Sequence, residues 1–133
     1  MKSTVLLAGL AIMMASCSKD GDKVADCRTC GEMRIIVDLK HHNAVIDSGM
    51  VYLKYNTTDK AANYDDSAVV VRTPTAEYEA TFYGKRVGSY YVFAKGFDKS
   101  LKQNVEGGVP VSINNDYAQT GYELTVPVTE PGH

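Results

Sequence analysis

The sequence predicts an all-β fold, a two-sheet antiparallel sandwich of about seven strands. From residue 32 onward, apolar and polar residues alternate with a period of two, which is typical of half-buried strands. The alternating runs recur every ~10–15 residues with turn-forming residues between them, and they show little helical periodicity. The chain has 133 residues, which is enough for one such domain and short for two.

The first expected strands lie in the N-terminal half of the domain. Residues 33–40 place four apolar side chains on one face, namely Met33, Ile35, Val37 and Leu39. Residues 50–55 form a second strand and residues 68–72 a short third one, which Pro74 separates from the fourth. The polar residues 56–67 are expected to be a loop, in which 58–63 could form one helical turn.

The remaining strands are expected at residues 77–83, 88–97, 109–114 and 121–128. The second of these is apolar on both faces, as expected of a central strand. Turns are predicted where Gly, Asn and Asp gather between the runs, at residues 47–49, 84–88, 107–108 and 114–116.

Four of these runs together resemble the transthyretin-like (prealbumin-like) sandwiches, which include the carboxypeptidase regulatory-like domains. The residues that carry the resemblance are Gly49, Val51 and Leu53; Ala80 and Phe82; Gly88, Tyr90, Val92 and Ala94; and Val109, Val111 and Ile113. The resemblance covers roughly residues 32–128 and implies a transthyretin-like or immunoglobulin-like arrangement of two sheets. It also implies a spacer, adhesive or accessory role and no enzymatic activity.

The N-terminus resembles a bacterial lipoprotein signal peptide, expected to span residues 1–16. Lys2 precedes an apolar run over residues 5–15, which is too short to cross a bilayer. The run ends in Met-Ala-Ser-Cys, similar to a lipobox, which implies that Cys17 receives diacylglycerol and becomes the acylated first residue. The alternative is an ordinary cleaved signal followed by an unrelated cysteine.

Residues 17–31 are predicted to be a lipidated flexible tether, followed by the sandwich domain at 32–128 and a C-terminal tail at 129–133. The tether is polar and poor in groups that could pack. An aspartate directly after the lipidated cysteine often retains lipoproteins in the inner membrane; this chain has Ser18 there, which favours the outer membrane. The stretch Ser-Lys-Asp resembles the export tags of surface lipoproteins in Gram-negative bacteria. The expected location is therefore the outer membrane or cell surface.

Cys27 and Cys30 form the most conspicuous motif, Cys-x-x-Cys. The motif precedes a strand, so it lacks the helix N-terminus that lowers a thiol pKa in redox sites. Zinc would need two further ligands, and we expect the rings of His41 and His42 to point to opposite faces of an extended segment. A small disulfide is therefore expected outside the cytoplasm, with no metal site and no cofactor.

Two further features concern the surface. Asp66-Ser67-Ala68 resembles a bacterial O-glycosylation acceptor, which implies Ser67 as the modified residue; the alternative is a chance match of three residues. Nine tyrosines accompany three phenylalanines and no tryptophan. Tyr52, Tyr83 and Tyr91 could supply contact area for a partner or could be ordinary half-buried sandwich residues.

The sequence contains none of the common nucleophile, zinc-protease or phosphate-loop motifs, and its net charge of −2 gives no basic excess for nucleic acid. We therefore expect a non-enzymatic lipoprotein, anchored in the membrane through its N-terminal lipid, that contacts an envelope protein or a polysaccharide. The alternative is a periplasmic redox or metal-handling lipoprotein that uses Cys27 and Cys30 with the histidine pair. A purely structural spacer is the third possibility.

Overall fold

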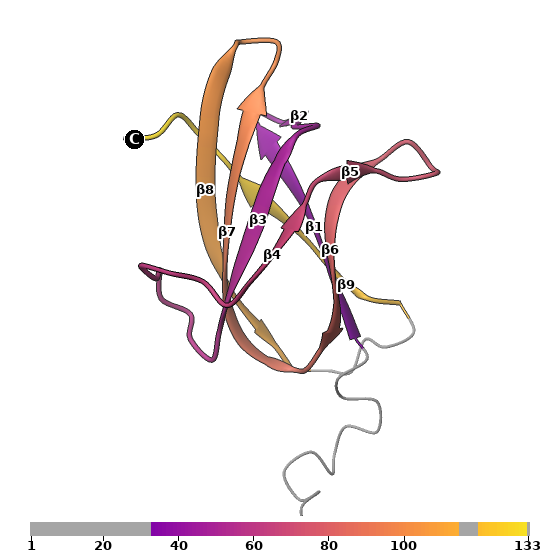
Figure 1. The fold of residues 1–133 in the computed structure, drawn as a ribbon, viewed down its shortest axis with the longest axis vertical. Coiled ribbons are helices and arrows are strands. Elements are labelled where there is room, and N and C mark those ends of the chain that lie inside the picture. The colour runs from indigo at the N-terminus through magenta and orange to yellow at the C-terminus, as the bar shows by residue number, and fades with distance from the viewer. Residues whose placement is uncertain (1–32, 115–119, 133) are drawn as a thin grey trace, which may run out of the picture.

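Two β-sheets face each other in the computed structural model, which describes residues 33–114 and 120–132 (Figure 1). These residues contain strands and turns but no helix. The prediction of an all-β, two-sheet sandwich is confirmed. Residues 1–32 lie outside the described residues, so the calls on the signal peptide, the tether and Cys17, Cys27 and Cys30 stay predictions.

The first sheet is built around β1 (Met33–His41). It pairs antiparallel with β6 (Tyr78–Lys85), where Ile36 lies opposite Thr81, and parallel with β9 (Tyr122–Pro127), where Ile35 lies opposite Tyr122. The other members of this sheet are β2 (Ala44–Val45), β5 (Val71–Arg72), β6 (Tyr78–Lys85) and β9 (Tyr122–Pro127).

The second sheet has the order β4-β3-β7-β8 and is antiparallel throughout. Its strands are β3 (Gly49–Tyr55), β4 (Asp66–Val69), β7 (Gly88–Asp98) and β8 (Gln103–Ile113). Because β7 lies between β3 and β8, the expectation that residues 88–97 form a central strand is confirmed.

The core lies between the sheets and consists of the side chains that alternate inward along each strand. Val37, Leu39, Val51 and Leu53 are fully buried, on the faces that the alternation predicts. The loop 56–65, between β3 and β4, projects from the lower left of the second sheet in Figure 1.

Two elements differ from the predictions of the sequence. Residues 68–72 do not form one strand, because the chain leaves the second sheet after β4 and joins the first as β5. Between them Val70 is buried, and its N–H donates to the Gly49 carbonyl (2.9 Å). The predicted helical turn at 58–63 is absent, and instead the Thr57 hydroxyl accepts from the Asp59 N–H (3.1 Å) in an irregular loop.

The expected turn at Gly107 and Gly108 was also wrong, since both glycines lie within β8, opposite Ala94 and Phe93. The chain turns earlier, between Asp98 and Gln103. The glycines instead provide space: a Cβ at Gly107 would lie 2.1 Å from the Pro127 carbonyl oxygen.

Candidate functional site

The outer face of the second sheet carries an aromatic cluster. Along β7, Tyr90, Val92 and Ala94 point into the core, so Tyr91 and Phe93 point outward. Tyr52 lies opposite Phe93 on β3, and the ring of Tyr64 from the loop 56–65 contacts both of their rings. We call the surface around these four rings, Tyr52, Tyr64, Tyr91 and Phe93, the aromatic groove.

Three of these rings, Tyr52, Tyr64 and Phe93, contact one another. The centroids of Tyr64 and Phe93 are 5.7 Å apart, with their planes within 10° of parallel. Tyr52 lies 5.7 Å from Tyr64 and 6.2 Å from Phe93. Contacts between aromatic rings at such distances contribute about 0.5–1.5 kcal/mol each beyond the burial of area, so the loop is held against the sheet.

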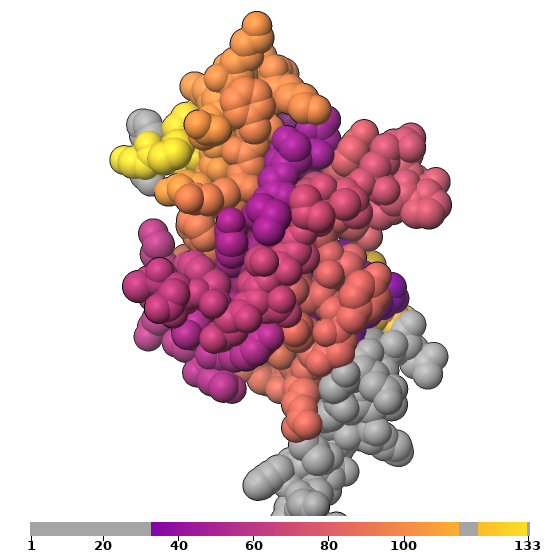
Figure 2. Space-filling model, in the orientation of Figure 1, coloured from indigo at the N-terminus to yellow at the C-terminus, as the bar shows by residue number. Residues whose placement is uncertain are grey.

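Two adjoining hollows of about 310 Å³ and about 150 Å³ lie along these rings and share Lys60, Phe93 and Glu106 in their walls. In Figure 2 the surface is indented between the magenta loop and the orange strands. The groove thus has an aromatic floor with open sides.

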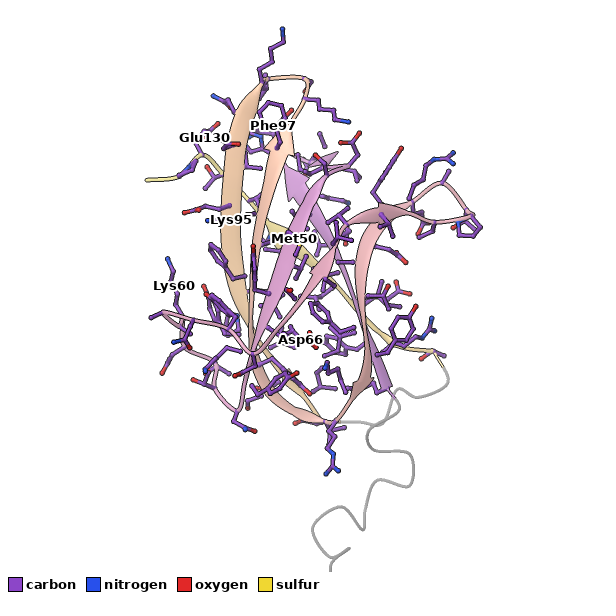
Figure 3. The ribbon with its side chains drawn as sticks, in the orientation of Figure 1. Met50, Lys60, Asp66, Lys95, Phe97 and Glu130 are labelled. Carbon is purple, nitrogen blue, oxygen red and sulfur yellow. The ribbon has the colours of Figure 1, made fainter. Side chains whose placement is uncertain are left out.

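Charged side chains line the same groove. The Lys60 ammonium lies 5.6 Å from the centroid of the Phe93 ring, a cation–π contact. Lys95 on β7 stands opposite Glu106 on β8. In Figure 3, Lys60 comes from the loop at the left and Lys95 from the sheet. Burial raises the pKa of Tyr64, whose hydroxyl oxygen is itself buried.

A second cluster lies at the turn between β1 and β2. We expected the rings of His41 and His42 to point apart, and this was wrong: their centroids are 4.1 Å apart. His42 does not continue the strand, because it and Asn43 have φ of 53° and 69° and form a two-residue hairpin turn. The turn folds the second ring back beside the first.

His41 is 1% exposed and lies between two carboxylates. Its Nδ1 lies 2.7 Å from Asp98 Oδ2, and its Nε2 lies 3.3 Å from Glu130 Oε2. The other oxygen of Asp98 accepts from the hydroxyl and N–H of Ser100 and from the N–H of Leu101. These contacts, led by the one with His41, lower the pKa of Asp98 to about 2, so the carboxylate is ionised and His41 Nδ1–H donates to it.

A hollow of about 470 Å³ lies outside the first sheet, and acidic residues line much of it, among them Asp38, Glu77, Glu79 and Glu123. Burial, followed by the neighbouring carboxylates, raises the pKa of Glu79. The carboxylates give this surface a negative potential.

Of the surface residues predicted from sequence, Tyr52 and Tyr91 join the aromatic groove, whereas Tyr83 stands on the other sheet and is 70% exposed. Ser67 is exposed on β4, which leaves its hydroxyl accessible; its glycosylation stays a prediction.

The sequence analysis missed Lys60, Tyr64 and Phe93 in the groove, and Asp98 and Glu130 beside the histidines. Phe93 had a signal, because a central strand that is apolar on both faces must place some apolar side chains outside the core. Tyr64 had none, since it lies in a polar loop.

Within residues 33–114 and 120–132 there is no helix with the length and apolarity needed to span a bilayer. Comparisons of the chain with protein-family models, curated proteins and solved structures gave no match.

Proposed function

We propose that this protein is a non-enzymatic, lipid-anchored accessory protein of the outer membrane or cell surface that binds a polysaccharide in its aromatic groove. The observation that carries the binding role is a group of partly exposed aromatic rings with positively and negatively charged side chains beside them. They lie on a sheet face that no other part of the described chain covers fully.

A sugar ring has an apolar C–H face and a rim of hydroxyls. The rings of Tyr52 and Phe93 offer flat apolar area to such a face, whereas Lys60, Lys95 and Glu106 offer a donor or acceptor to hydroxyls. The open, mixed groove therefore favours a glycan.

The resemblance of the strand pattern to transthyretin-like sandwiches supports an accessory role, because such domains usually serve as spacers or adhesive modules. The lipobox-like sequence before Cys17 supports anchoring, and two or three acyl chains hold a protein firmly to a membrane. The polar tether would give the domain reach from that membrane.

The groove is tested by measuring binding of the protein to a panel of purified bacterial surface polysaccharides. Tyr64→Ala removes a ring that lines the groove, and we expect affinity for the bound polysaccharide to fall about tenfold, as loss of a stacking contact of about 1.4 kcal/mol would produce. Tyr83→Ala, on the other sheet, is the matched control and should bind as the parent does.

Two results would contradict this assignment. If no polysaccharide of the panel binds while crosslinking in native envelopes captures a protein at the groove, the partner is a protein. If Tyr83→Ala weakens binding as much as Tyr64→Ala, the groove is not the binding surface.

The anchor is tested separately with Cys17→Ala in the producing cell. We expect the parent protein in the membrane fraction with the mass of a diacylglycerol and an acyl group, and the variant without either. A parent protein that fractionates as the same soluble product as the variant would refute lipid anchoring.

A further inference from the structure

We infer that His41, His42 and Glu130 form a binding site for a divalent transition metal ion of the zinc type. Each residue offers one ligand atom, and these three atoms lie within 4.8 Å of one another. The proposal uses neither cysteine of the Cys27–Cys30 motif. Glu130 also lines the smaller hollow of the aromatic groove, but the proposal does not rest on glycan binding there.

His41 is prepared as the first ligand. Asp98 Oδ2 lies 2.7 Å from Nδ1, and the tautomer that donates Nδ1–H to this carboxylate carries its lone pair on Nε2. A carboxylate that orients a histidine through its other nitrogen is the usual outer partner of a zinc ligand, because it fixes the ring and raises its basicity.

The buried Nε2 of His41 makes no hydrogen bond within the described part of the chain, although Glu130 Oε2 lies 3.3 Å away. With the lone pair on Nε2, two electron-rich atoms face each other at that distance. A cation bound there would satisfy Nε2, which as an unsatisfied buried polar atom otherwise costs about 1–3 kcal/mol.

The other two ligands reach the same point from separate segments. His42 is brought there by the hairpin turn and is exposed, so its ring can rotate toward the ion. Glu130 is held through its second oxygen, which accepts from the Thr129 hydroxyl (3.0 Å), and Thr129 in turn pairs with Glu106 of β8 (2.8 and 2.9 Å).

The spacing suits zinc. Ligand atoms ~2.0–2.2 Å from a tetrahedral ion are ~3.4 Å apart, close to the 3.3 Å between His41 Nε2 and Glu130 Oε2. Only the His42 ring has to move closer. Two histidines and one glutamate are a common zinc set that leaves a fourth position for water or a ligand. Asp98 and Glu130 together balance the two positive charges.

The test is calorimetric titration of Zn²⁺ into the full-length chain carrying Cys17→Ala, Cys27→Ser and Cys30→Ser, so that no thiol can bind the ion. We expect one ion per chain and a raised melting temperature that EDTA reverses. Co²⁺ in place of Zn²⁺ should give the visible absorption of a four-coordinate site.

Two variants remove ligands with little cost to the fold. His42→Asn keeps a residue that tolerates positive φ, and Glu130→Gln keeps the shape of the side chain. Each should weaken Zn²⁺ binding more than about tenfold. Glu77→Gln, which removes an exposed carboxylate from the hollow outside the first sheet, is the control that should bind as the parent does.

The inference is overturned if the thiol-free chain does not bind Zn²⁺, which would leave His41 as an ordinary buried histidine between two carboxylates. It is also overturned if Zn²⁺ binds but neither His42→Asn nor Glu130→Gln weakens it. Neither result would bear on the aromatic groove, which Tyr64→Ala tests separately.

Discussion

At the scale of single residues, Asp98 at the end of β7 is a buried carboxylate with partners at both of its oxygens. It is buried, it holds His41 with one oxygen, and with the other it accepts from Ser100 and Leu101 in the turn to β8. A buried carboxylate is tolerated only when such donors replace water. Asp98 therefore couples the β7–β8 turn to the end of β1.

This carboxylate predicts a specific pH dependence. Its pKa is lowered to about 2 from the ordinary value of 3.8, so the folded state favours the ionised form. The resulting stabilisation is fully present above pH 3.8 and is lost as the pH falls toward 2.

We expect the free energy of unfolding, measured by urea denaturation in EDTA, to decrease over that window. Asp98→Asn should be less stable near neutral pH and show a smaller decrease on acidification. Asp59→Asn, which removes an exposed loop carboxylate, should retain the decrease of the parent. Equal pH profiles for Asp98→Asn and the parent would show that another group governs acid unfolding.

At the scale of elements, the link between β4 and β5 is where the chain changes sheets. Val70 occupies the crossing and is 5% exposed, whereas its neighbours Val69 and Val71 are 55% and 51% exposed. Three consecutive valines therefore have different environments, because the middle one points between the sheets. Its backbone also donates to Gly49, which joins the crossing to β3.

Val70→Ala should lower the free energy of unfolding by about 2 kcal/mol, from two buried methyl groups at about 0.8 kcal/mol each and a small cavity. Val69→Ala, the same change at the adjacent exposed position, should change it by less than about 0.5 kcal/mol. The comparison uses chemical denaturation of both variants. Similar losses in the two would mean that Val70 is not the residue that packs at the crossing.

At the scale of the whole molecule, the two sheets meet closely along the edge formed by β8 and β9. Gly107 of β8 lies against the Pro127 carbonyl, and Glu106 pairs with Thr129 just beyond. In Figure 1 the yellow chain of β9 passes behind β8 toward the C-terminus. This contact also positions Glu130 beside His41, so the proposed metal site depends on how the sandwich closes.

Gly107→Ala should destabilise the protein by about 1–3 kcal/mol, because the new Cβ would lie 2.1 Å from a backbone oxygen that moves only with β9. Gly108→Ala is the matched control. Its Cβ would meet the Tyr91 hydroxyl at 2.4 Å, and that flexible side chain can swing aside at a smaller cost in stability.

The two variants are compared by thermal unfolding, in which Gly107→Ala should have the lower melting temperature. A Gly107→Ala variant as stable as Gly108→Ala would contradict the close approach of β8 and β9. Because Tyr91 lines the groove, Gly108→Ala should also alter polysaccharide binding directly. Gly107→Ala should affect binding only by lowering the stability of the fold.

The period-two pattern was sufficient to predict the sandwich and most of its buried face, because alternation of side chains is a local property of every strand. Val37 and Leu53 could be placed in the core from their neighbours alone. The lipobox-like segment before Cys17 is likewise local in sequence, and the proposal of an anchor depends on that segment alone.

Sheet membership and both candidate sites were decided only by the tertiary structure. The break at Val70 depends on which strand each half of residues 66–72 pairs with, and pairing is a long-range choice. His41 meets Asp98 across 57 residues, and Tyr64 reaches Phe93 by folding a polar loop over the sheet. Contacts of this kind depend on the packing of distant segments, so neither Asp98 nor Tyr64 carries a local signal of its partner.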